Sequence, residues 1–163
     1  MEPEPAPWFA GLSRETTLYR DAEGRWFHDD QPLEHAKLSR AFDGWIGRGD
    51  DGRYCLRNSI NWAYIRLDGP PYFVRSVRLL ADGGVELHLS GDREARLEPQ
   101  SLYQDAAGAL YCRVFEERLI ARFDSHAAAQ LAPRLNEDPT GVYLDVDGRQ
   151  VRPPVVDDPL ALG

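Results

Sequence analysis

The sequence has little of what common catalytic and metal-binding motifs are built from. It contains two cysteines, one methionine and four histidines. The cysteines, Cys55 and Cys112, form neither a CxxC pair nor a zinc-ligand spacing, and their strand-like apolar neighbours predict small buried thiols. No GxSxG, Walker, HExxH or dinucleotide-binding motif occurs. A hydrolase or a metal enzyme therefore has the least support.

Positive charge and long apolar runs are scarce as well. Acidic residues number 27 against 19 basic ones, giving a formal net charge of −8, and every basic residue except Lys37 is an arginine. A surface for duplex nucleic acid needs a positive field, so that partner is excluded. No apolar run is long enough to cross a bilayer, and the first residues lack the basic and apolar regions of a signal peptide. We expect a cytoplasmic protein without a membrane partner.

What is present predicts an α+β fold of two small related subdomains. Each subdomain is expected to combine antiparallel strands with one amphipathic helix, since 163 residues with 42% hydrophobic content can bury a core. The expected parts are a flexible N-terminal arm (1–13), an N-terminal α+β subdomain (14–71), a β-rich C-terminal subdomain with one helix (72–154) and a flexible tail (155–163). The arm carries a Trp8-Phe9 pair, which we expect to dock on the body of the protein.

The first half reads as a hairpin, a helix and two strands. Gly24 supplies the turn of the hairpin, and Pro32 suits the opening of the helix. Four apolar residues recur at i, i+4, i+7 and i+8, a spacing that predicts one apolar helix face: Leu38, Phe42, Trp45 and Ile46. Gly47 and Gly49 then end the helix, and strands are expected over 53–57 and 62–67.

The second half reads mainly as antiparallel strands. Strands are expected over 72–80, 85–89, 93–97, 110–115, 118–123, 142–146 and 150–152. A helix is expected over 125–135, in which Pro133 predicts a kink or an early end. Asp147-Gly148 is a strong hairpin turn signal, and the calcium-loop start around Asp145 lacks the later ligands.

The two halves share one order of elements. An aromatic strand leads to an acidic turn, a helix, an acidic glycine turn and a strand with a tyrosine, which is Tyr54 in the first half and Tyr143 in the second. Two explanations stay open at this point: an internal duplication, or chance similarity between simple strand–helix–strand patterns.

The order of motifs resembles the bacterial family of uncharacterised proteins known as domain of unknown function 1285. The resemblance is best over Gly24–Phe73 and looser beyond. Its marks in this chain are Pro32-Leu33, the helix with Leu38 and Phe42, the Asp51-Gly52-x-Tyr54-x-Leu56 strand, Ile65-x-Leu67-Asp68, Pro71-Tyr72, Gly91-Asp92, Leu110–Val114 and Gly141-Val142-Tyr143.

The resemblance has implications for fold and ligand. It implies two related subdomains, the second like a pleckstrin-homology sheet, and a nucleotide-like ligand at the subdomain interface. The family has a Thr-Pro-x-Glu run where this chain has Asn58-Ser59-Ile60-Asn61, so an amide replaces a carboxylate here. Asp147-Gly148-Arg149 stands in place of the family's glycine-rich ending.

One segment combines arginines, amides and aromatic rings on or beside two strands: Arg57, Asn58, Asn61, Trp62, Tyr64 and Arg66. Amides can read a base edge, rings can stack and arginines can hold phosphate. The alternative is ordinary strand chemistry, in which arginines pair with surface carboxylates and aromatic rings cover the sheet. If the two halves face each other across a cleft, Arg113 and Arg122 are the expected partners from the second half.

The densest set of metal-type ligands is His28, Asp29, Asp30 and His35. Because the acidic pair precedes a helix, we interpret the set as helix capping and solvation, and we expect no metal or cofactor. The sequence thus favours a non-enzymatic ligand-binding or signalling module, with a protein-interaction adaptor as the alternative.

Overall fold

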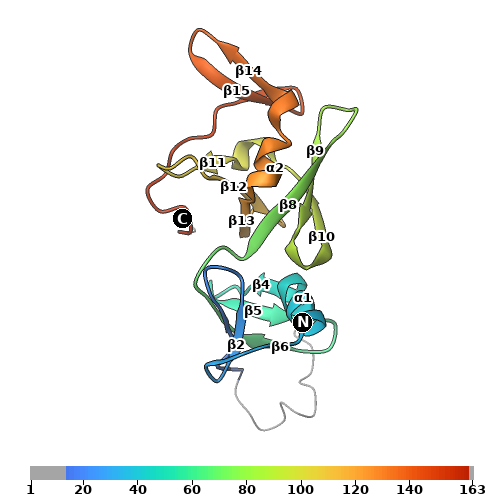
Figure 1. Cartoon of the computed structure of the whole chain (residues 1–163), viewed down its shortest axis with the longest axis vertical. Coiled ribbons are helices and arrows are strands. Elements are labelled where there is room, and N and C mark those ends of the chain that lie inside the picture. The colour runs from blue at the N-terminus through green and yellow to red at the C-terminus, as the bar shows by residue number, and fades with distance from the viewer. Residues whose placement is uncertain (1–13, 162–163) are drawn as a thin grey trace. The chain divides into compact units, whose positions relative to one another are not determined.

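The computed structural model describes residues 14–161, so the predicted arm and its Trp8-Phe9 pair lie outside the described residues. The chain divides into two compact units, with the boundary between Pro71 and Tyr72 (Figure 1). We call them unit 1 and unit 2. The fold is α+β, with several mainly antiparallel sheets and two helices.

Unit 1 contains two small sheets and helix α1 (Ala36–Trp45). One sheet has the order β3-β2-β1-β7, in which β7 runs parallel to β1. The other is an antiparallel meander, β4-β5-β6. The strand bounds are β1 (Tyr19–Arg20), β2 (Trp26–His28), β3 (Gln31–Pro32), β4 (Ile46–Arg48), β5 (Tyr54–Arg57), β6 (Trp62–Tyr64) and β7 (Arg66–Leu67).

Helix α1 begins later than its sequence predicts. Pro32 lies in β3, and His35 caps the helix, because its Nδ1 accepts a hydrogen bond from the Leu38 N–H. A proline can end a short edge strand, because it lacks only its own backbone N–H donor and an edge strand has a neighbour on one side only. The helix ends at Trp45, and Ile46 already has extended backbone and starts β4. The predicted apolar face over Leu38, Phe42 and Trp45 is present, but these side chains are only half-buried.

A buried arginine joins strand β1 of unit 1 to helix α1 and to the end of the unit. Arg20, 2% exposed, pairs with Asp43 on α1 at 2.9 Å and donates to the carbonyls of Pro70 and Pro71. Trp26 Nε1 also donates to Asp43, at 2.8 Å. A buried guanidinium needs such a full set of partners, because its desolvation is expensive.

Unit 2 is built around a six-stranded sheet of order β10-β9-β8-β13-β12-β11, in which only β13 and β8 run parallel. Helix α2 (Ser125–Ala129) packs on β8 (Figure 1). The bounds of the sheet strands are β8 (Tyr72–Leu79), β9 (Val85–Leu89), β10 (Arg93–Arg96), β11 (Tyr103–Gln104), β12 (Leu110–Val114) and β13 (Leu119–Phe123). Cys112 in β12 is fully buried, which confirms the structural thiol, as the burial of Cys55 does in unit 1.

A second, three-stranded sheet completes unit 2. It is the meander β14 (Leu135–Asp138), β15 (Gly141–Val146) and β16 (Arg149–Val151). The Asp147-Gly148 hairpin turn is confirmed, with φ of 53° and 75° as a tight mirror-image turn requires. The helix predicted over 125–135 ends early, as its proline indicated: α2 stops at Ala129, and a 3₁₀ turn that contains Pro133 (Ala132–Arg134) leads into β14.

The two units repeat one arrangement. In each, a helix is followed directly by a three-stranded antiparallel meander, β4-β5-β6 after α1 and β14-β15-β16 after α2. Tyr54 and Tyr143 both lie on the central strand of their meander. The shared order seen in the sequence thus corresponds to two related subdomains.

The described part of the expected C-terminal tail is held in place. Val155 and Val156 lie beside β11, where the Val156 N–H donates to the Gln104 carbonyl at 2.8 Å, and the chain then turns between Asp158 and Ala161. The Tyr103 hydroxyl donates to the Pro159 carbonyl at 2.6 Å. Proline blocks helix and sheet continuation, yet it leaves carbonyls free to accept such hydrogen bonds. The flexibility of the tail stays a prediction. Neither helix within residues 14–161 has the length and apolar run of a membrane span.

Candidate functional site

The pairing of β5 with β6 brings three of the predicted site residues together in unit 1. Arg57 lies opposite Trp62, and Cys55 lies opposite Tyr64. Directly paired residues share a face of the sheet, and so do alternate residues of a strand. Arg57, Trp62 and Tyr64 therefore project from one face of the meander, while Leu56 and Ala63 belong to the other.

A polar cavity of about 450 Å³ covers this face, and we call it the Arg57 cavity. The residues that line it are Arg48, Gly49, Asp50, Asp51, Cys55, Arg57, Trp62 and Tyr64. Sequence reasoning missed Arg48 and the loop after it, because it interpreted Gly47 and Gly49 as a helix stop. The alternation Ile46-Gly47-Arg48, followed by a turn and a strand, is the signal that predicts the hairpin found there.

Arg57 is the cation of this cavity that is free to meet an anion. Its guanidinium lies 5.4 Å from the centre of the Trp62 ring and forms no ion pair or hydrogen bond with any residue in 14–161. Other exposed arginines of unit 1 are neutralised, such as Arg53 by Glu15 and Arg66 by Asp68. An unpaired guanidinium offers planar, bidentate recognition of phosphate or carboxylate.

Asp51 and Tyr64 hold each other in place at the same cavity. The Tyr64 hydroxyl donates to Asp51 Oδ2 at 2.7 Å, and the Arg53 N–H donates to Oδ1 at 3.0 Å. The Tyr64 hydrogen bond lowers the pKa of Asp51, and the same bond raises the pKa of Tyr64. Arg53 lies 3.6 Å above the Tyr64 ring. Asp51 is therefore a charged acceptor at neutral pH.

The side chains of the two amides in the predicted set are hydrogen-bonded within unit 1. Asn58 Oδ1 accepts from the backbone N–H groups of Ile60 and Asn61, which closes the β5–β6 turn. The buried Asn61 accepts from Arg14 at 2.5 Å and from the Trp62 N–H at 2.9 Å. Asn61 Nδ2 and Trp62 Nε1 are buried donors without a hydrogen-bond partner in the described part of the chain.

Asn58, Asn61 and Trp62 also border an apolar groove of about 340 Å³, completed by Leu18, Leu38, Phe42, Trp45, Leu56 and Ala63. We call it the α1 groove. Trp62 thus stands between a polar cavity and an apolar one. The half-buried face of α1, with Leu38, Phe42 and Trp45, forms one wall of the groove.

Arg66 is not part of this arrangement. The strand breaks after Tyr64, and β7 joins the other sheet of unit 1 beside β1. Arg66 bonds there to Asp68 at 3.0 Å and lies 4.1 Å from the Tyr19 ring. Continuous alternation over 62–67 concealed this change of sheet.

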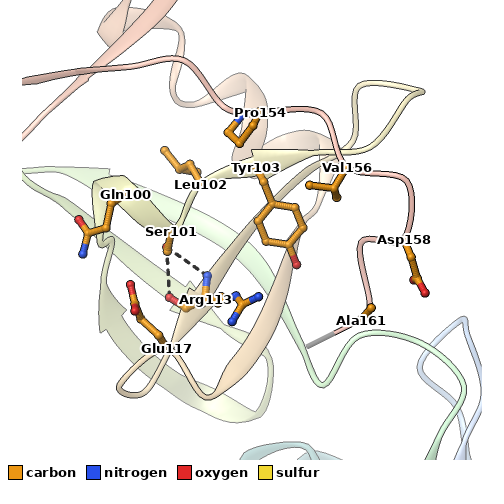
Figure 2. Close-up of a pocket in the computed structure, with 10 residues that line it drawn as sticks. All are labelled: Gln100, Ser101, Leu102, Tyr103, Arg113, Glu117, Pro154, Val156, Asp158 and Ala161. Atoms are coloured by element: carbon orange, nitrogen blue, oxygen red, sulfur yellow. Dashed lines mark hydrogen bonds between the residues drawn. The ribbon is translucent and has the colours of Figure 1, made fainter. Parts of the chain in front are cut away.

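Arg113 lies in unit 2 and lines a cavity of about 420 Å³, which we call the Arg113 cavity (Figure 2). Residues 100–103, the β12–β13 hairpin and the C-terminal segment 154–161 form its walls. Ser101 Oγ accepts from the Arg113 backbone N–H at 3.1 Å and donates to the Glu98 carbonyl at 2.8 Å. The buried serine fixes the strand that carries Arg113. The dashed lines in Figure 2 mark its two contacts with the backbone N–H and carbonyl of Arg113.

Arg122 lies outside both cavities. It is exposed on β13, where its guanidinium is 5.9 Å from the centre of the Tyr111 ring. The predicted set therefore divides into residues at the Arg57 cavity, one residue at the Arg113 cavity, two turn-forming amides and two surface arginines.

The metal-type residues around α1 have other partners. His35 is the cap of α1, and Asp29 accepts from the Thr17 hydroxyl at 2.6 Å. His28 Nε2 lies 3.7 Å from Asp29 Oδ2. Within residues 14–161, no group of three or more His, Cys, Asp or Glu side chains is placed to hold a metal ion.

Two solved structures are similar to this chain along most of its length. A DUF1285 family protein from Silicibacter pomeroyi DSS-3 matches 93% of this chain and 88% of its own, with a TM-score of 0.66 and 19% identity. A DUF1285 family protein from Shewanella baltica OS155 matches 76% of this chain and 96% of its own, with a TM-score of 0.59 and 15% identity. The chain has the DUF1285 fold.

No protein-family model matches the sequence, and no functionally curated protein matches it either. At 19% and 15% identity the DUF1285 likeness shows the fold alone, so the function has to be argued from the cavities.

Proposed function

We propose that this protein is a non-enzymatic, cytoplasmic ligand-binding module that binds a nucleotide-like anion in the Arg57 cavity and takes part in signalling. The observation that carries the proposal is the unpaired Arg57 guanidinium at the wall of a polar cavity, in a protein with a net charge of −8. Arg57 holds the phosphate, since a guanidinium is the side chain best suited to it.

The other groups of the cavity fit the rest of a nucleotide. Asp50 and Asp51 line the same cavity as the two arginines, and carboxylates accept hydrogen bonds from sugar hydroxyls. Tyr64 is half-exposed and offers a ring edge to a base. Trp62 is buried, so it supports Arg57 and does not offer a free stacking face. Phosphate contact therefore supplies more of the affinity than base stacking.

The proposed pleckstrin-homology likeness of the second half draws support from a mainly antiparallel sheet with one helix packed on it. The parallel β13–β8 pair is a departure from a purely antiparallel sheet. The signalling role is part of the proposal, because a bound nucleotide can act by shifting conformational populations.

A thermal-shift panel tests the proposal. Nucleoside monophosphates, triphosphates and short single-stranded oligonucleotides are compared with matching nucleosides and with inorganic phosphate. A ligand present at 100 times its Kd stabilises the unit that binds it by about 2.7 kcal/mol. We expect stabilisation by at least one phosphorylated nucleoside, loss of the shift in Arg57→Gln, and no effect of Arg149→Gln, which removes an exposed guanidinium from β16.

If no phosphorylated compound stabilises the protein, the nucleotide-like ligand has to be dropped from the proposal. The adaptor alternative would then gain, because the α1 groove exposes Leu38, Phe42 and Trp45 on one helix face.

A further inference from the structure

The Arg113 cavity has a charge arrangement that the Arg57 cavity lacks. Arg113 and Glu117 line the same cavity from the same hairpin, yet they form no ion pair with each other or with any residue in 14–161. Opposite charges that share a cavity without touching leave both groups to be satisfied by solvent or by a ligand.

The remaining polar side chains of the cavity are already engaged. Ser101 is bonded to the backbone of Glu98 and Arg113, and the Tyr103 hydroxyl donates to Pro159. Gln100 donates to Glu98 at 3.3 Å, and Asp158 accepts from the Leu160 N–H at 3.3 Å. Among the charged side chains of the cavity, Arg113 and Glu117 form no side-chain hydrogen bond or ion pair within residues 14–161, whereas Asp158 accepts one bond from the backbone.

The backbone holds Glu117 in an unusual position. Phe115, Glu116 and Glu117 have φ of 54°, 61° and 63°, three consecutive left-handed residues that are not glycine. Each such residue costs about 1–2 kcal/mol relative to ordinary backbone. The ring of Phe115 anchors the turn, with the Arg93 guanidinium 4.1 Å from its centre. Strain of this kind is retained where the placement of a side chain matters.

The other walls of the cavity are apolar. Leu102 and Tyr103 are buried on one side, and Val156 packs against the cluster of Tyr103, Tyr111 and Ile120. Figure 2 shows Val156, Asp158 and Ala161 on the wall that faces Gln100 and Glu117. An apolar side chain of a ligand has a place there, and about 420 Å³ is sufficient for a small metabolite.

We propose that the Arg113 cavity is a second ligand site, which binds a free amino acid with an apolar side chain. The ligand carboxylate pairs with Arg113, its ammonium group pairs with Glu117, and its side chain contacts Val156 and Ala161, the accessible apolar residues of the lining. The site does not depend on the nucleotide-like ligand, because it lies in the other unit and takes a zwitterion without phosphate.

An NMR titration of the full chain with L-leucine tests this site. We expect saturable shifts confined to the backbone amides of residues 100–103, 113–117 and 154–161. Arg113→Gln and Glu117→Gln are each expected to weaken binding about tenfold or more, the loss of one charge-assisted contact. Two matched controls, Arg122→Gln on the neighbouring strand and Glu116→Gln in the same turn, should leave the affinity unchanged, and so should Arg57→Gln.

Ligand variants test the same claim without any risk of misfolding. N-acetyl-L-leucine lacks the ammonium charge and L-leucinamide lacks the carboxylate, so both should bind about tenfold more weakly or worse than L-leucine. The proposal is overturned if wild-type protein shows no shifts with L-leucine, if either analogue binds as well as L-leucine, or if folded Arg113→Gln keeps the wild-type affinity.

Discussion

At the residue scale, the contact between Tyr64 and Asp51 makes the most direct pH prediction. The Tyr64 hydroxyl is the largest cause of the lowered pKa of Asp51. Tyr64→Phe should therefore raise the pKa of Asp51 toward its ordinary value, as measured by carbon-detected NMR of the carboxyl groups. Asp82, whose pKa is lowered mainly by Arg96, serves as an internal control and should not change.

The sign of the linked stability effect follows from the same shift. Because the folded-state pKa of Asp51 is lower than the unfolded one, its contribution is present above the ordinary carboxyl pKa. It is lost as pH falls through the depressed value. Tyr64→Phe should reduce the pH dependence of stability in that acidic window, and an unchanged acid-unfolding profile together with an unchanged Asp51 pKa would contradict the contact.

The buried ion pair of unit 1 predicts a large effect of one substitution. Asp43→Ala leaves Arg20 buried without its carboxylate and removes the acceptor of Trp26, so it should destabilise unit 1 by about 3–5 kcal/mol. Denaturant unfolding monitored by tryptophan fluorescence measures this loss. Asp68→Ala breaks the exposed pair with Arg66 and should change stability little. Equal losses of stability in the two variants would show that Asp43 does not stabilise the buried Arg20.

Sequence reasoning at this scale named Arg57, Trp62 and Tyr64, which line one cavity, but could not separate them from Arg66 or Arg122. All five are strand residues with similar neighbours along the chain. What distinguishes them is pairing: Arg66 meets Asp68 and Tyr19, whereas Arg57 meets no carboxylate among the described residues. Partners distant in sequence are decided by packing, which residue spacing does not encode.

At the element scale, Arg134 joins the meander of unit 2 to its main sheet. Its guanidinium donates to the carbonyls of Leu80, Gly83, Gly84 and Asp145. Arg134→Ala should destabilise unit 2 by about 1.5–3 kcal/mol, since charged hydrogen bonds to buried carbonyls are lost. Hydrogen exchange should rise in the β8–β9 turn and in β15, while β12 and β13 stay protected.

Arg134→Lys is the matched control for this prediction. Lysine keeps the charge but not the planar fork, so it should recover only part of the lost stability. A uniform rise of exchange across the whole of unit 2 in Arg134→Ala would mean that the residue supports the unit as a whole instead of joining two sheets.

The long strands were predictable, and several of the short ones were not. Val85–Leu89 alternates cleanly between apolar and polar residues, and the strand has those bounds. In contrast, β3, β4, β11 and β14 have two to four residues each and escaped prediction. Such short segments carry too little periodicity to be recognised, and they become strands because a neighbour pairs with them.

At the scale of the whole molecule, net charge makes a negative prediction. With a net charge of −8, the protein should not bind a 20-base-pair DNA duplex at physiological salt, whereas a small phosphorylated ligand needs only a local guanidinium. A fluorescence-anisotropy titration with labelled duplex measures this. Salt-dependent duplex binding would show a positive surface patch despite the negative net charge.

The architecture of the whole molecule was more predictable than its chemistry. The order of helices, turns and tyrosine strands indicated two related subdomains, because each local pattern agreed with the same repeated unit. Neither cavity could be predicted, since each combines residues from separate strands and loops. The similarity to DUF1285 structures shows the fold and does not identify a ligand.

The most direct test of the Arg57 cavity is a calorimetric titration of wild-type protein, Arg57→Gln and Arg149→Gln with the phosphorylated nucleoside that stabilises the protein best. We expect one saturable site in the wild type and in Arg149→Gln, and about tenfold or weaker binding in Arg57→Gln. Equal affinity for all three proteins would contradict the assignment of the phosphate to Arg57. The absence of binding by every nucleotide tried would contradict the proposed function.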